Sequence, residues 1–176
     1  MEFIAIFLFY AACVFLLIGV HETGHYLAGV AGGIPAKEMR IRLFVFPQHV
    51  VLRDGERWIS PSDHGPFVET VWRHLATRPR VYFFVAGGLL LETVFTSIVS
   101  VLLVQFGWPK MALALVGLSL IMFVPWLLLE PIMVWRTGHA WGDFSGMWFI
   151  AKLPTVILVL ALLAIRVVLG WYAVVV

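Results

Sequence analysis

Cysteine and charged residues are scarce in this 176-residue chain, and each shortage excludes a class of protein. The single cysteine, Cys13, rules out an internal disulfide and any metal site built from several cysteines, and its apolar neighbours favour a simple packing role. Charged residues make up 12% of the chain, while hydrophobic residues make up 62% and the mean hydropathy is +0.99. Soluble proteins do not have this composition. We therefore expect an integral membrane protein with one domain over residues 1–176.

Four apolar segments are long enough to cross a lipid bilayer. A transmembrane helix needs about 20 apolar residues, and the segments at 3–30, 81–106, 111–135 and 154–176 meet this requirement. The first segment lacks a positive charge before its apolar run, and that run is longer than the hydrophobic region of a usual signal peptide, so we interpret it as a retained span. The predicted fold is an all-α polytopic membrane protein with about four transmembrane helices.

One extended polar region, residues 36–66, separates the first two spans. Residues 39–46 and 49–53 have the composition of short strands, and Asp54-Gly55 is a strong hairpin signal before a third candidate strand at 56–59. We expect a small β-hairpin region of two or three strands in this loop.

Basic residues predict the orientation of the spans. Eight Lys and Arg residues lie between positions 37 and 80, Arg136 and Lys152 lie in the third loop, and Lys110 marks the second. The positive-inside rule then makes the first and third loops cytoplasmic, in a multi-pass protein of a bacterial-type cytoplasmic membrane. A short amphipathic helix near residues 67–75 suits the membrane surface. The basic loops favour anionic lipid as a partner, and no nucleic acid is needed to explain them.

The chemistry concentrates at residues 21–25, which read HETGH near the cytoplasmic end of the first span. On a helix His21 and His25 share one face and can bind one metal ion, while Glu22 stands beside them to handle a proton. Three ionisable groups in one turn of a membrane helix exceed what helix packing requires. The pattern predicts a Zn²⁺ site with His21 and His25 as ligands and Glu22 as the catalytic general base.

A zinc site needs at least a third protein ligand, and three residues are candidates. Asp143 follows the third span on the cytoplasmic side and begins an apolar helical stretch. Glu130 lies inside the same end of that span, before Pro131, and His139 lies in the loop between them. We favour Asp143 on position and keep Glu130 and His139 as alternatives.

Two further charged residues, Glu92 and Arg166, lie inside the second and fourth spans. At about 1.5 Å per residue they are about 16 Å and about 18 Å from the cytoplasmic ends of their helices. Charges at that depth are costly unless paired. We expect a buried structural ion pair between these two spans.

The order of these features resembles the site-2 protease family of intramembrane zinc metalloproteases. The resemblance covers most of the chain: HETGH in a first span, a β-rich membrane-side loop, the sequence VAGGLL at 85–90 opening the next span, and an aspartate after a proline-containing span. It implies His21, His25 and Asp143 as zinc ligands and Glu22 as the base that cleaves transmembrane protein substrates.

Two segments depart from the motifs of that family. Gly88 and Leu91 stand where the family has proline and asparagine, and Asp143 is flanked by glycine and phenylalanine where the family has Leu-Asp-Gly. Two other functions remain open. A CAAX-protease-like membrane peptidase would take a glutamate, here Glu130, as the third ligand, and a non-catalytic membrane protein would bind only metal or substrate. The sequence leaves the substrate and the oligomeric state open.

Overall fold

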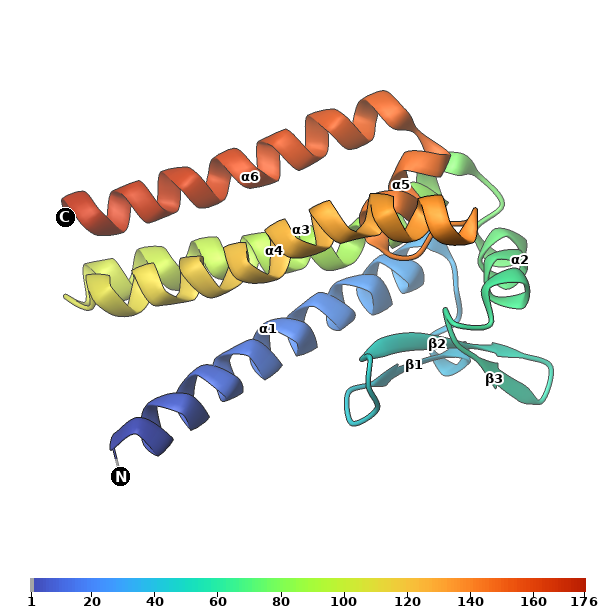
Figure 1. The fold of residues 1–176 in the computed structure, drawn as a ribbon. Helices are drawn as coiled ribbons and strands as arrows, with labels where there is room; N and C mark the ends of the chain where they lie inside the picture. The colour runs from blue at the N-terminus through green and yellow to red at the C-terminus, as the bar shows by residue number, and fades with distance from the viewer. Residues whose placement is uncertain (1) are drawn as a thin grey trace.

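The fold is a bundle of long helices with a small sheet at one end, as seen in a computed structural model that describes residues 2–176 (Figure 1). Within that range, four helices are long and apolar enough to cross a membrane. They are α1 (Glu2–Gly32), α3 (Arg78–Gln105), α4 (Pro109–Thr137) and α6 (Lys152–Val175). The prediction of about four such helices in a mostly helical chain is confirmed, with ends close to those expected.

A three-stranded antiparallel sheet follows α1 and the short 3-10 turn η1 (Ala36–Glu38). Its strands, in the spatial order β1-β2-β3, are β1 (Met39–Arg42), β2 (His49–Asp54) and β3 (Arg57–Ile59). The predicted hairpin is present, because Asp54 pairs with Arg57 and Gly55 adopts a left-handed φ of 62°. Glycine takes this conformation without steric cost, which suits a two-residue hairpin turn.

The first strand is shorter than predicted. It ends at Arg42, which pairs with His49, so residues 43–48 form a loop. Pro47 has no N–H for a ladder hydrogen bond, and the Phe44–Phe46 stretch is continuously apolar where a half-buried strand would alternate. Phe44 and Phe46 are 93% and 89% exposed, and the Phe44 ring lies 5.8 Å from that of Phe15 in α1. The loop therefore presents exposed aromatic side chains beside the first long helix.

Two shorter helices complete the end of the bundle that carries the sheet (Figure 1). They are α2 (His64–Leu75) and α5 (Asp143–Ile150). α2 is amphipathic as predicted, since Val71 and Leu75 are buried while Arg73 is exposed and pairs with Asp54 at 2.8 Å. The two chain ends lie at the opposite end of the bundle.

Backbone contact between α1 and α3 depends on glycine. A Cβ added at Gly24 would fall on the carbonyl oxygen of Gly87 and lie 2.9 Å from Cα of Gly88. A Cβ added at Gly87 would lie 2.6 Å from the Cβ of Ala28. Small residues allow helices in apolar surroundings to approach this closely. The contact sets the HETGH segment directly against the first half of α3.

We expect Gly24→Ala to destabilise the bundle, because α1 and α3 must separate to admit the methyl group. Overpacking of this kind costs about 1–3 kcal/mol, more than the gain of up to about 1 kcal/mol in helix propensity. Thermal unfolding in detergent, followed by circular dichroism, measures the difference.

Gly117→Ala in α4 is the matched control. A Cβ there meets no atom within 4 Å among the neighbours that the structure describes, so its unfolding temperature should equal or exceed that of the unmutated protein. Equal unfolding temperatures for Gly24→Ala and Gly117→Ala would contradict the proposed role of the α1–α3 contact.

Candidate metal centre

Three side chains from two separate elements meet at the end of the bundle that carries the sheet. His21 and His25 lie one turn apart on α1, with their Nε2 atoms 3.1 Å apart. Asp143, the first residue of α5, places Oδ2 at 2.8 Å from Nε2 of His21 and at 3.3 Å from Nε2 of His25. In the part of the chain that the structure describes, this is the one cluster of three His, Cys, Asp or Glu side chains arranged to hold a metal ion.

The spacing of these three atoms fits a small tetrahedral cation. Zinc binds nitrogen and oxygen ligands at about 2.0–2.2 Å, and tetrahedral geometry then sets neighbouring ligand atoms about 3.3–3.6 Å apart. The three separations here, 2.8, 3.1 and 3.3 Å, lie at or below the lower end of that range. Two imidazoles and one carboxylate are also a donor set typical of catalytic zinc, which keeps a fourth position open. The residues therefore fit the metal that the sequence predicted.

Gly88 of α3 borders the same space. A Cβ at this position would lie 2.5 Å from Nε2 of His25 and 2.6 Å from Nε2 of His21. Any side chain here, proline included, would fill the space that both nitrogens face. Glycine at position 88 therefore keeps the space in front of the two nitrogens open.

The second ring nitrogen of each histidine faces an acceptor on α3. Nδ1 of His25 is 2.9 Å from the backbone carbonyl oxygen of Phe84, and Nδ1 of His21 is 3.6 Å from Oε2 of Glu92. Metal-binding histidines usually donate this second N–H to a carbonyl or carboxylate oxygen, which fixes the tautomer and the ring orientation. Both Nε2 atoms are thereby left facing Asp143.

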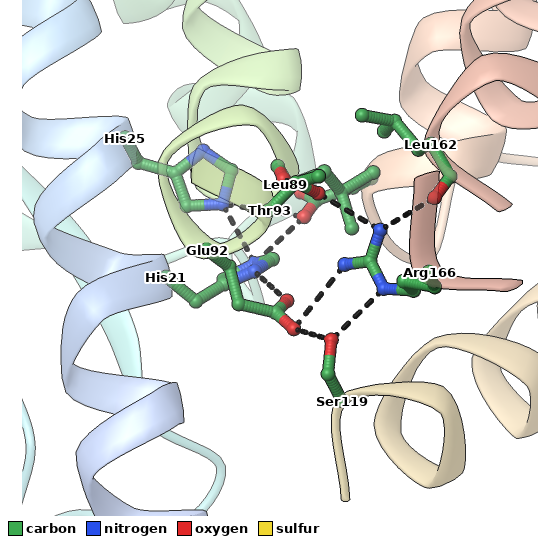
Figure 2. A network of polar contacts seen from close by, with 9 residues as sticks. His21, His25, Leu89, Glu92, Thr93, Ser119, Leu162 and Arg166 are labelled. Atoms are coloured by element: carbon green, nitrogen blue, oxygen red, sulfur yellow. Dashed lines mark hydrogen bonds and ion pairs between the residues drawn. The ribbon is translucent and has the colours of Figure 1, made fainter. Parts of the chain in front are cut away.

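The predicted ion pair between Glu92 and Arg166 is present, at 3.3 Å (Figure 2). Arg166 is fully buried and also donates to Ser119, Thr93 and the carbonyl of Leu162. Glu92 is 2% exposed. Each of the two lies 14 residues after the first residue of its helix, so they meet at equal depth.

The carboxyl group of Asp143 is held in its ionised form. Burial alone would raise its pKa, but the facing rings of His25 and His21 more than offset burial, and the pKa of Asp143 lies well below its usual range. A metal ligand must be deprotonated to bind. Asp143 therefore meets this condition without a further partner.

The two alternative third ligands point elsewhere. Glu130 is buried, and its Oε2 accepts hydrogen bonds from the backbone N–H and the hydroxyl of Ser145, each at 2.7 Å. It holds the start of α5 and lies against Gly142. His139 is 2.9 Å from the carbonyl of Ala140 and stacks on His64 with ring centroids 4.3 Å apart. Neither belongs to the three-residue cluster.

Sequence reasoning missed the groups that support the cluster. The acceptor at Phe84 is a backbone carbonyl, which every residue has, so the sequence does not mark it. Ser119 looks in the sequence like any small residue of an apolar helix. Glu92 was predicted, but only as a partner of Arg166. Glu92, Thr93 and Thr96 share one face of α3 by their helical spacing, and this is the sequence signal that could have pointed to the network. Glu22 is 8% exposed, and its role as a base stays a prediction.

Comparisons of the chain with protein-family models, with curated proteins and with solved structures found no match. The chemistry of the site is therefore interpreted from its own geometry.

We expect Asp143→Asn to weaken zinc binding by more than about 100-fold, because changes outside the ligand set cost about 10- to 100-fold and this change removes a ligand charge. Glu130→Gln is the matched carboxyl-to-amide control. Its amide oxygen can still accept the Ser145 N–H, so affinity should fall by less than about 10-fold. Competition with a chromophoric chelator measures both. The reverse order of effects would make Glu130 the third ligand, as in a CAAX-protease-like peptidase.

Proposed function

We propose that this chain is an intramembrane zinc metalloprotease of the site-2 protease type, which hydrolyses a peptide bond in a transmembrane substrate near the cytoplasmic side. The observation that carries the proposal is the convergence of His21, His25 and Asp143 within 2.8–3.3 Å of one another, with Glu22 in the same helical turn. The order of these residues along the chain matches the resemblance drawn from the sequence.

The charge distribution supports placement of the site at the cytoplasmic face. The first and third loops, which hold ten basic residues, lie at the end of the bundle that carries the sheet, α2 and α5 (Figure 1). The connection from α3 to α4, where the first turn of α4 holds Lys110, lies at the other end with the two chain ends. The positive-inside rule makes the first of these ends cytoplasmic. Asp143, on α5, lies at that end.

Each residue of the site has a defined role in the proposed reaction. His21, His25 and Asp143 hold the zinc ion through Nε2, Nε2 and Oδ2. When bound, zinc supplies a Lewis acid that polarises the scissile carbonyl and lowers the pKa of water toward about 7. Glu22 takes a proton from the attacking water and delivers it to the leaving amine.

Hydrolysis also requires that water reach the site. The side chains of His21 and Asp143 are 18% and 23% exposed, whereas His25 is 11% exposed. The site is therefore partly open, most of all at Asp143, which suits the entry of water that the reaction needs. The side of the site toward Glu92 is shielded from solvent, since Glu92 is 2% exposed.

An apolar groove offers an approach for the substrate. It has a volume of about 530 Å³ and is lined by the faces of α1 and α3 and by Leu43 of the β1–β2 loop. It runs from Phe15 and Ile98 to Thr23, so its end reaches the same depth along α1 as the histidines, on a different face of that helix. A transmembrane segment matches this lining, because apolar surface pairs with apolar surface.

The β1 strand provides main-chain partners for an unwound substrate. β1 and β3 are the edges of the sheet, and β1 is followed by the loop that contacts Phe15. An extended peptide added to an exposed edge strand gains backbone hydrogen bonds. We place the substrate on β1 because this edge lies beside α1, which carries the HETGH residues.

Glu22→Gln should keep the fold and the zinc but lose cleavage by about 10²- to 10⁴-fold, the usual contribution of a general acid–base group. The assay uses single-span reporter proteins reconstituted with zinc-loaded enzyme in phospholipid vesicles, with products identified by mass spectrometry. Glu69→Gln, on the exposed side of α2, is the matched control and should cleave normally.

Retained cleavage by Glu22→Gln would exclude Glu22 as the base. Bound zinc without cleavage of any reporter by the unmutated protein would instead favour a non-catalytic metal- or substrate-binding protein.

A further inference from the structure

We infer that Glu92 is a positioning residue for His21, and that Arg166 and Ser119 hold Glu92 in the orientation this requires. The inference rests on the proposed metal site and deepens it. It gives the buried ion pair of α3 and α6 a role at the metal centre, in addition to its role in helix packing.

The two oxygens of the Glu92 carboxylate have different partners (Figure 2). Oε1 accepts a hydrogen bond from the hydroxyl of Ser119 at 2.7 Å and faces Nη2 of Arg166 at 3.3 Å. Oε2 faces Nδ1 of His21 at 3.6 Å. An ion pair that only neutralised charge would place both carboxylate oxygens toward the guanidinium, whereas here only Oε1 contacts Arg166.

Arg166 is satisfied without using Oε2. Its Nε donates to Ser119 at 2.8 Å, and its Nη1 donates to Thr93 at 2.8 Å and to the carbonyl of Leu162 at 3.1 Å. Its Nη2 donates to Oε1 of Glu92. The guanidinium also lies 4.5 Å from the ring centroid of Phe123. These contacts hold one side of the carboxylate and leave the other side for His21.

His21 needs an acceptor at the position where Oε2 lies. Its Nε2 is engaged with Asp143 and His25, so Nδ1 is the nitrogen that must carry the proton when Nε2 binds a metal. At 3.6 Å the Nδ1–Oε2 distance exceeds a hydrogen bond, but the oxygen is charged and faces the ring. Nδ1 of His25 also faces an acceptor on α3, and at 2.9 Å from the Phe84 carbonyl oxygen it is within hydrogen-bonding distance.

Two consequences follow for the metal. An acceptor at Nδ1 fixes the tautomer that leaves the Nε2 lone pair free, and a carboxylate acceptor makes the imidazole a stronger ligand. Substitution of such an acceptor weakens metal binding by about 10- to 100-fold. Glu92 should therefore contribute to zinc affinity independently of its contribution to folding.

The zinc affinities of four proteins separate these contributions: the unmutated chain, Glu92→Met, Arg166→Met, and the double variant Glu92→Met/Arg166→Met. Methionine has nearly the shape of glutamate but offers no carboxylate or amide oxygen to Nδ1 of His21. Each single change leaves a buried charged group without its partner, and after Arg166→Met this group is the Glu92 carboxylate. Both changes are therefore expected to lower the unfolding temperature. The double variant removes both charges and should recover much of that loss. Thr96→Val, at a buried site one turn further along α3, is the control.

We expect the double variant to bind zinc about 10- to 100-fold more weakly than the unmutated protein while unfolding at a similar temperature. Thr96→Val should bind zinc normally. A folded double variant with unmutated affinity would overturn the inference and leave the proposed metal site intact. An unmutated protein that binds no zinc would overturn both.

A measurement on the unmutated protein keeps the inference testable if the double variant does not fold. Nitrogen-15 NMR of zinc-loaded protein with labelled histidine reports which ring nitrogen carries a proton. His21 should be protonated at Nδ1 and metal-bound at Nε2. Zinc bound through Nδ1 of His21 would contradict a positioning role for Glu92.

Discussion

The backbone contact between α1 and α3 is the constraint on which the rest of the structure depends. Gly24 and Gly87 have no side chains to hold the helices apart, and Gly88 leaves room beside the two histidine rings. The close approach of the two helices also brings the carbonyl of Phe84 to Nδ1 of His25 and the carboxylate of Glu92 to Nδ1 of His21. Acceptors of this kind orient histidine rings that bind a metal and strengthen them as ligands.

A polar network centred on Glu92 links the four long helices. His21 of α1 faces Glu92 of α3, which binds Ser119 of α4 and Arg166 of α6. An unpaired charge at this depth would cost several kcal/mol, so the network has a structural role whatever its chemistry. Asp143 approaches from the open end of the bundle, where Glu130 binds Ser145 and holds the start of α5. The histidines thus have a rigid, closed side and an accessible side.

Much of this arrangement could be predicted from the sequence because membrane helices are long and uniform in composition. Spans, the hairpin at Gly55 and the pair of Glu92 with Arg166 all follow from local patterns and from the cost of buried charge. The prediction that the first strand extends to residue 46 was wrong, although the continuously apolar Phe44–Phe46 stretch and Pro47 are signals in the sequence against it. The acceptor at Phe84 and the bond from Glu130 to Ser145 depend on tertiary packing, which no local pattern encodes. Asp143 was favoured on position, and the structure brings it to the two histidines.

The central claim is that His21, His25 and Asp143 form one zinc site, and X-ray absorption spectroscopy of the purified, unmutated protein at the zinc edge tests it most directly. We expect one zinc per chain, with only nitrogen and oxygen ligands at about 2.0–2.2 Å and the scattering pattern of two imidazole rings. Sulfur ligation, a single imidazole, or the absence of stoichiometric zinc after supplementation would contradict this account.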